Sequence, residues 1–123
     1  MLVILQTTNI KMEKIDITRD QERIARIAKA LGHPTRVAIM YFLAHQQQCY
    51  FGAIHDIFNI SKPTVSQHLK ELKSAGLIEG EVEAPKVRYC INMENWNEAK
   101  KLFAKFFDLC QCGCGPDCQC NDN

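Results

Sequence analysis

IHDIFNISKPTVSQHLKELKSAGLI, residues 54–78, contains two short amphipathic segments separated by a break at Asn59. Apolar residues recur three and four positions apart in both segments, so each is predicted to form a helix that buries one face. Ser61 can cap the second helix, Pro63 is tolerated in its first turn, and Gly76 can end it. The residues expected in the core of this pair are Ile54, Ile57, Phe58, Val65, Leu69 and Leu72. The stretch therefore predicts a helix-turn-helix.

The outward face of the second helix carries hydroxyl, amide and basic side chains. Short polar side chains suit base edges in the major groove of DNA, and lysines suit phosphates. The residues of this helix expected to contact DNA are Lys62, Thr64, Ser66, Gln67, His68, Lys70 and Lys73. The alternative interpretation is a solvated helix in any small α protein, because helix pairs joined by short turns are common.

Two alternating segments follow, GEVEA and KVRYCIN, with Pro85 between them. They predict antiparallel strands near residues 77–82 and 86–92. A hairpin placed directly after a recognition helix makes a winged helix-turn-helix, in which Lys86 and Arg88 are candidate DNA contacts. The first strand is unusually acidic for a DNA contact, with Glu79, Glu81 and Glu83.

The predicted fold is mainly α with a small β-hairpin wing. Thr18 and Gln21 can form a capping box for a first helix, Pro34 can open a second, and Asn92 can cap the last. The helices are expected near residues 20–31, 34–44, 52–59, 62–75 and 93–110.

The segments ALGHPTRVAIMYFL (30–43) and SKPTVSQHLKELKSAGLI (61–78), with the hairpin after them, resemble the ArsR/SmtB family of bacterial metal-sensing repressors. The resemblance covers about residues 20–109. It implies a repressor that binds double-stranded operator DNA. An enzyme is not expected, because the sequence has no nucleotide-binding loop and no paired carboxylates with a supporting histidine.

The last predicted helix carries an aromatic stripe at spacings of three and four, which needs a partner surface. Its members are Trp96, Ala99, Phe103, Phe106 and Cys110, widened by Leu102, Phe107 and Leu109. In the resembling family the first and last helices form the dimer interface, so we expect a homodimer that dimerises through its terminal helices. A two-fold dimer calls for an inverted-repeat operator with half-sites about 34 Å apart. The alternative is that this helix packs only on its own domain.

The end of the chain, CQCGCGPDCQC, is rich in thiols. Five cysteines in eleven residues of a cytosolic chain favour a soft ion over a disulfide framework. The candidate metal ligands are Cys110, Cys112, Cys114, Cys118 and Cys120. Trivalent arsenic or antimony, bound by three thiolates, is the expected inducer, and cadmium, lead or zinc is the alternative. Two other interpretations are that Cys110 is a small core residue and that the tail has no sensing role.

Other metal sites known in the resembling family are not expected in this chain. Arsenic-sensing members open the third helix with a Cys-x-Cys pair, whose positions hold Tyr50 and Gly52 here. Cys49 is one residue off that pattern, and it and Cys90 are predicted to be small buried residues. The zinc site of other members uses acidic and histidine ligands on the last helix, which has no histidine here.

The length of 123 residues allows one domain with one modest core. Residues 1–17 are expected to be a disordered extension, residues 18–109 the DNA-binding and dimerisation domain, and residues 110–123 the sensor tail. The apolar start MLVIL is too short for a signal peptide or a membrane span, so a cytoplasmic protein without a membrane partner is expected. No small-molecule substrate is expected.

The predicted mechanism is derepression, in which the metal-free dimer binds the operator and ion capture at the tail lowers its DNA affinity. Two alternatives remain open. In the first, the tail thiols form disulfides and release DNA without a metal. In the second, the protein buffers or transfers metal ions and retains the helix-turn-helix only as a scaffold.

Overall fold

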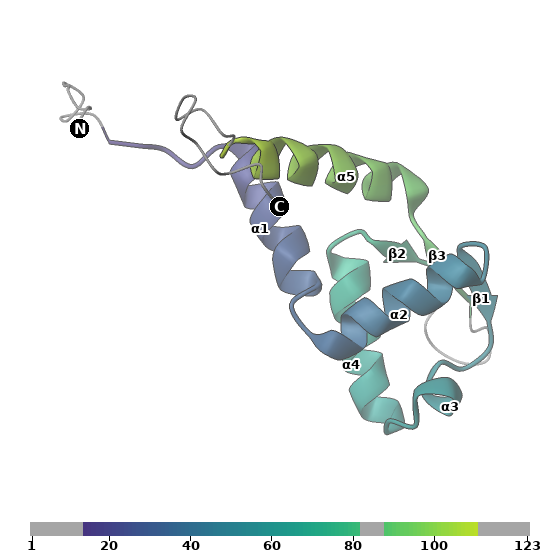
Figure 1. The fold of residues 1–123 in the computed structure, drawn as a ribbon. Coiled ribbons are helices and arrows are strands. Elements are labelled where there is room, and N and C mark those ends of the chain that lie inside the picture. Colours follow the sequence, from purple (N-terminus) through teal and green to yellow (C-terminus); the bar gives the residue numbers. More distant parts are fainter. Residues whose placement is uncertain (1–13, 82–87, 111–123) are drawn as a thin grey trace, which may run out of the picture.

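The computed structural model describes residues 14–81 and 88–110. Five helices and three short strands make up this part of the chain (Figure 1). The elements are α1 (Arg19–Ala30), α2 (Pro34–His45), β1 (Cys49–Phe51), α3 (His55–Phe58), α4 (Lys62–Ser74), β2 (Ile78–Glu79), β3 (Arg88–Ile91) and α5 (Met93–Asp108). The prediction of a mainly helical winged helix-turn-helix is confirmed.

Helices α1, α2, α4 and α5 begin where the local sequence signals predict, whereas the helix expected near residues 52–59 is limited to His55–Phe58. Thr18 and Gln21 form a complete capping box at the start of α1. The side chain of Ser61 accepts a hydrogen bond from the backbone N–H of Thr64, and Asn92 caps α5 in the same way. Pro34 lies in the first turn of α2, where its missing N–H costs no helical hydrogen bond. These boundaries depend on contacts within a few residues, which is why the sequence predicts them.

The core lies between α2, α4 and the sheet, and it contains the predicted residues of α4. Val65, Leu69 and Leu72 are buried, and Ile54 is fully enclosed. The prediction for Ile57 is wrong, because this side chain is 41% exposed. The reason is the length of α3, which is only four residues and cannot present a full buried stripe.

A three-stranded antiparallel sheet replaces the predicted two-stranded hairpin. The strand order is β1-β3-β2, so β3 is central and β1 is an edge strand that the sequence did not predict. The strands expected near 77–82 and 86–92 are shorter in the structure, as Ile78–Glu79 and Arg88–Ile91. The predicted turn at Pro85 lies outside the described residues.

Gly80 ends the pairing of β2 at a close approach between backbones. Its φ is +123°, and a Cβ added there would collide with the backbone carbonyl oxygen of Arg88. Only glycine adopts this conformation without a steric cost. The chain therefore leaves β2 at a fixed residue.

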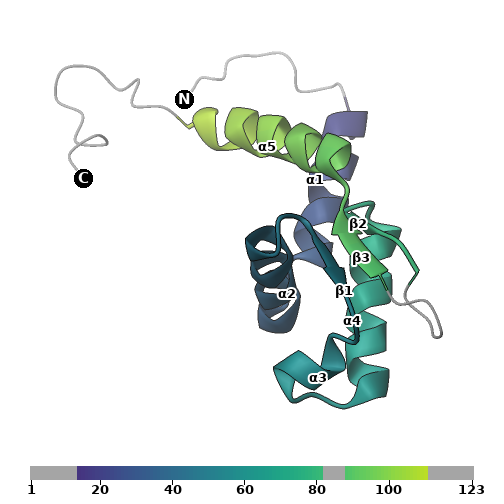
Figure 2. The same ribbon diagram turned by 90° about the vertical axis from the view of Figure 1, so that its right-hand side faces the viewer.

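Helix α5 packs beside α1 at one end of the molecule, and α3 lies at the opposite end (Figures 1 and 2). The first half of α5 covers the core, with Ala99 buried and Trp96 packed against the cluster. The end of α5 does not, since Phe107 is 69% and Leu109 is 79% exposed. None of the described helices is both long and apolar enough to cross a membrane.

Candidate nucleic-acid interface

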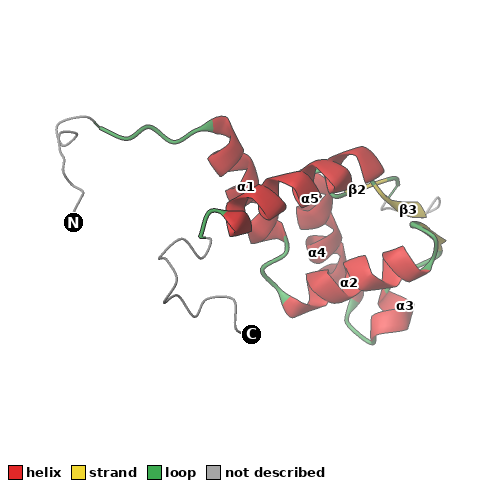
Figure 3. Cartoon of the chain, turned by 45° about the horizontal axis from the view of Figure 1, so that its top comes forward, coloured by secondary structure: helices red, strands yellow, loops and turns green. Residues whose placement is uncertain are grey.

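Helix α4 is held by its buried face and presents its opposite face to solvent. Figure 3 shows α4 with α1 and α5 on one side of it and α2 and α3 on the other. The exposed residues among those predicted to contact DNA are Lys62, Thr64, Gln67, Lys70 and Lys73. A row of amide, hydroxyl and ammonium groups on one helix face matches the groups that read base edges and phosphates. The structure therefore brings most of the predicted contacts onto one surface.

Ser66 and His68 are only partly exposed, which the sequence did not indicate. The ring centroids of His68 and His33 are 4.4 Å apart, so His68 packs against the start of α2. Burial lowers the pKa of His68 from its usual value of 6.5, and electrostatic interaction with His33 and Arg36 lowers it further. The shift favours the neutral form of the imidazole, which makes His68 a weaker candidate for a phosphate contact.

Arginines of α1 and α2 hold the C-terminal half of α4. Arg26 donates to the carboxylate of Glu71 at 3.1 Å and to the hydroxyl of Ser74 at 2.8 Å. Arg36 lies 3.9 Å from the same carboxylate, and its Nε has no hydrogen-bond partner among the described residues. Arg23 donates to the backbone carbonyl of Ala75 at 2.9 Å. The orientation of α4 is thus fixed by side chains of two other helices.

Two of the predicted DNA contacts hold the wing in the free protein. The ammonium group of Lys73 donates to the carbonyl of Gly80 at 2.7 Å. The guanidinium of Arg88 lies 3.7 Å from the carboxylate of Glu81. Lys86, the other predicted wing contact, lies outside the described residues. Lys73 and Arg88 are accordingly ordered by the wing before any DNA binds.

Comparisons with known proteins agree with this geometry. Residues 33–79, which span α2 to the end of β2, match the model of the bacterial regulatory proteins of the arsR family. An uncharacterised HTH-type transcriptional regulator of Methanocaldococcus jannaschii is 36% identical over 81 residues, which are 66% of this chain and 91% of that protein. The chain belongs to the arsR family. The family consists of regulatory proteins, which agrees with the prediction that the chain is not an enzyme.

Two further relatives have more specific names. The HTH-type transcriptional repressor SmtB of Mycobacterium tuberculosis is 40% identical over 63 residues, which are 51% of this chain and 46% of that protein. The cadmium resistance transcriptional regulatory protein CadC homolog of Staphylococcus aureus is 32% identical over 84 residues, 68% of this chain and 67% of that protein. The chain therefore spans about half the length of the first of these arsR-family relatives.

Only the first of the predicted metal ligands falls within the described residues of this arsR-family chain. Cys110 follows the end of α5, is exposed, and forms no disulfide with any described residue. Cys110 is therefore not part of the core of its own chain. Within residues 14–81 and 88–110, no group of three or more histidine, cysteine or acidic side chains could hold a metal ion. Cys112, Cys114, Cys118 and Cys120 lie outside the described residues.

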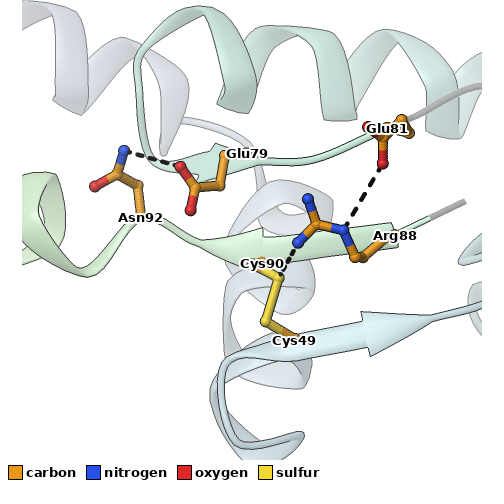
Figure 4. Close-up of a disulfide and its surroundings, with 6 residues drawn as sticks. All are labelled: Cys49, Glu79, Glu81, Arg88, Cys90 and Asn92. Atoms are coloured by element: carbon orange, nitrogen blue, oxygen red, sulfur yellow. Dashed lines mark hydrogen bonds and ion pairs between the residues drawn. A yellow bond between two sulfur atoms is a disulfide. The ribbon is translucent and has the colours of Figure 1, made fainter.

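Cys49 and Cys90 form a pair that the sequence did not predict. Cys90 is buried as predicted, whereas the same prediction is wrong for Cys49, which is partly exposed. The two residues form a disulfide between β1 and β3 (Figure 4). They are 41 positions apart in the sequence, and β1 is too short to give an alternating pattern. No sequence signal identified the pair, because it depends on how the two strands lie together.

Proposed function

We propose that this arsR-family protein is a transcriptional repressor that binds double-stranded operator DNA as a homodimer and releases it when a soft metal or metalloid ion binds. The observation that carries the proposal is the exposed polar face of α4 in a chain with a thiol-rich end. The name of the SmtB relative, a transcriptional repressor, supports repression as the outcome. Because bacterial operators lie in the cytoplasm, the protein would act there.

The exposed residues of α4 divide into two roles. Thr64 and Gln67 carry the short polar groups that suit base edges, whereas Lys62 and Lys70 suit phosphates. His68 contributes less than the sequence suggests, because its ring packs on His33. This division predicts which substitutions change sequence preference and which change only affinity.

The end of α5 supports the homodimer. Phe106 is 47% exposed, Phe107 is 69% exposed, and Leu109 is 79% exposed. Large apolar side chains gathered on one terminal helix are usual at interfaces and costly to leave in water. A two-fold axis through this region would place two copies of α4 on an inverted-repeat operator, with centres about 34 Å apart.

The tail thiolates are the proposed ligands. Cys110 is accessible at the exposed end of α5, and Cys112, Cys114, Cys118 and Cys120 follow it closely in the sequence. Trivalent arsenic or antimony fits a site of three thiolates with no nitrogen ligand. Cadmium, lead or zinc at the same thiolates is the second candidate, and the name of the cadmium-resistance relative favours cadmium within that group.

A physical route from the tail to the DNA-binding face passes through Arg23. Its Nε lies 3.5 Å from the carboxylate of Glu98 on α5, and its Nη1 donates to the carbonyl of Ala75 at the end of α4. A change at the end of α5 that displaces Glu98 would therefore act on α4 through one side chain. The ion must bind the two dimer geometries unequally, by about 1–3 kcal/mol for a 5–150-fold loss of DNA affinity.

The test is a titration of the reduced full chain, bound to a labelled operator chosen from random duplexes, with arsenite, antimonite, cadmium, lead and zinc. Fluorescence anisotropy reports operator release. The control is a chain truncated after Leu109, which lacks all five tail cysteines but retains α4 and the wing. We expect the truncated protein to bind the operator and to ignore every ion.

Serine substitutions at the five tail cysteines then identify the ligands. If three thiolates hold the ion, substitution at about three positions should abolish the response and substitution at the other two should be silent. The ion affinity should also fall in acid, because each thiol must lose a proton before it binds. A tail redox switch would leave two essential positions and would respond to peroxide. A truncated protein that still releases DNA on arsenite addition would refute the tail assignment, and a full chain that binds ions but no duplex would support metal buffering instead.

A further inference from the structure

The disulfide between Cys49 and Cys90 fastens an otherwise weakly held strand. Their Cα atoms are 4.0 Å apart, directly opposite each other in the pairing of β1 with β3. Strand β1 has three residues and lies at the edge of the sheet. A strand this short contributes few backbone hydrogen bonds, so the covalent bond is a large part of what holds it.

The segment before β1 makes that link more important. Gln47 and Gln48 have φ values of 57° and 82°, a region that residues with a Cβ adopt unfavourably. The backbone carbonyl of Gln48 accepts a hydrogen bond from Ile91 at 2.7 Å, so the strained turn is tied to β3 as well. If β1 separated from β3, this turn would be free to relax.

Strand β1 leads directly into the helix-turn-helix. Gly52, Ala53 and Ile54 separate it from α3, whose four residues depend on neighbouring elements for their position. The other end of the disulfide lies in β3, which runs into α5 after Asn92. The bond therefore joins the segment that enters α3 to the strand that enters the proposed dimerisation helix.

The surroundings of the two sulfur atoms differ, and this difference decides which of them a thiol attacks in thiol–disulfide exchange. Cys49 is partly exposed, whereas Cys90 is only 5% exposed. The Nη1 of Arg88 donates to the Sγ of Cys90 at 3.1 Å, and Glu81 lies beside the same guanidinium (Figure 4). A positive charge next to a sulfur stabilises its thiolate and makes it the better leaving group.

We propose that Cys49 and Cys90 are a redox-active pair that controls the order of residues 46–58. In reduction, the thiolate of a small thiol attacks Sγ of Cys49, the disulfide breaks, and the electron pair leaves on Sγ of Cys90 beside Arg88. A second small thiolate then attacks the small-molecule sulfur of the mixed disulfide, and the electron pair leaves on Sγ of Cys49, which yields two protein thiols and one small-molecule disulfide. The reverse exchange with that disulfide restores the bond.

A regulatory role is favoured over a structural one by the compartment. The inference rests on the proposed function to this extent, since a repressor works beside DNA in the reducing cytosol, where protein disulfides are usually catalytic or redox-sensing. The oxidised form is the one in which β1 and α3 are fastened in the arrangement described. Oxidation would therefore raise operator affinity, and reduction would lower it.

The test uses the metal-free full chain in glutathione buffers that range from reducing to oxidising. Differential alkylation followed by mass spectrometry reports the state of Cys49 and Cys90 separately from the tail thiols. Hydrogen exchange of residues 46–58 reports their order without any DNA, and anisotropy reports operator binding. On oxidation, we expect the thiols of Cys49 and Cys90 to become protected from alkylation together. Hydrogen exchange of residues 46–58 should slow about tenfold or more. Operator affinity should rise within the 5–150-fold range usual for coupled sites.

Two variants serve as controls. Cys49→Ser changes the edge strand and leaves the buried Cys90 in place. In every buffer, its hydrogen exchange and operator affinity should equal those of the reduced wild type. Cys110→Ser removes an exposed thiol outside the pair and should retain the redox response. If the thiols of Cys49 and Cys90 stay free in oxidising buffer, or if exchange of residues 46–58 is the same in both states, the inference is wrong. If hydrogen exchange of residues 46–58 changes with the redox state but the chain binds no DNA duplex, the redox-active pair is upheld and the proposed function is refuted.

Discussion

Phe107→Ala tests the proposed dimer with little disturbance of the single chain. The side chain is 69% exposed, so roughly a third of it is buried within its own chain. Full burial of a phenylalanine contributes about 1.5–3 kcal/mol, so the substitution should lower the free energy of unfolding of the monomer by only about 0.5–1 kcal/mol.

The expected effect on dimerisation is much larger. A two-fold interface contains both copies of Phe107, so about 3–6 kcal/mol of burial is at stake, less the part already buried in each chain. The remaining two-thirds amounts to about 2–4 kcal/mol, so at 1.4 kcal/mol per decade the dimer dissociation constant should rise by about 30–700-fold. Phe103 is a less selective target, because it packs against the core of its own chain.

Phe51→Ala provides a matched control. Phe51 is 71% exposed, almost as much as Phe107, but it lies on β1 rather than on α5. Sedimentation equilibrium over a range of concentrations should show a weakened dimer for Phe107→Ala and an unchanged one for Phe51→Ala. An equal dissociation constant for wild type and Phe107→Ala, or a wild-type chain that stays monomeric, would refute the argument from the exposed end of α5.

Three further predictions concern α4. Gln67→Ala should weaken operator binding by roughly 1–3 kcal/mol and relax sequence preference, measured by anisotropy with matched and mismatched duplexes; equal affinities would remove Gln67 from base recognition. Glu71→Ala leaves Arg36 without its acidic partner, so the free energy of unfolding should fall by about 1–3 kcal/mol in urea denaturation, and an unchanged urea midpoint would contradict the role of this ion pair. The pKa of His68 is lowered in the folded chain, so the unfolded chain binds more protons below pH 6.5 and the wild type should lose stability as the pH falls through that value. His68→Gln should lose less over the same interval, and a variant as acid-sensitive as the wild type would place the titrating group elsewhere.

The sequence predicts features that depend on near neighbours. The capping groups at Thr18, Ser61 and Asn92 interact with residues three positions away, and their helices begin where expected. The buried stripe of α4 is also visible, because Val65, Leu69 and Leu72 follow the helical period. The family follows from the same segments, which lie within or next to the matched region.

Features that depend on distant contacts are not predicted. Strand β1 exists because it pairs with β3, about 40 positions away, and its three residues show no period of their own. The disulfide of Cys49 with Cys90 follows from that pairing. His68 looks like a surface residue in the helical pattern, yet the start of α2 brings His33 against it. The sequence also treats α5 as one apolar stripe, whereas packing divides it into a covered half and an exposed half.

The double contact of Arg23 has a consequence for the construction of biosensors. One guanidinium joins Glu98 of α5 to the carbonyl of Ala75 at the end of α4. Under the proposed function, a thiol-rich tail grafted onto another scaffold of this fold would carry the proposed ligands but not this connection, so the chimera would capture its ion without signalling. Transplanting Arg23 and Glu98 together with the tail would supply the missing connection. A reporter gene that responds to the ion would show whether these two side chains are enough to transfer ion sensing to another protein of this fold.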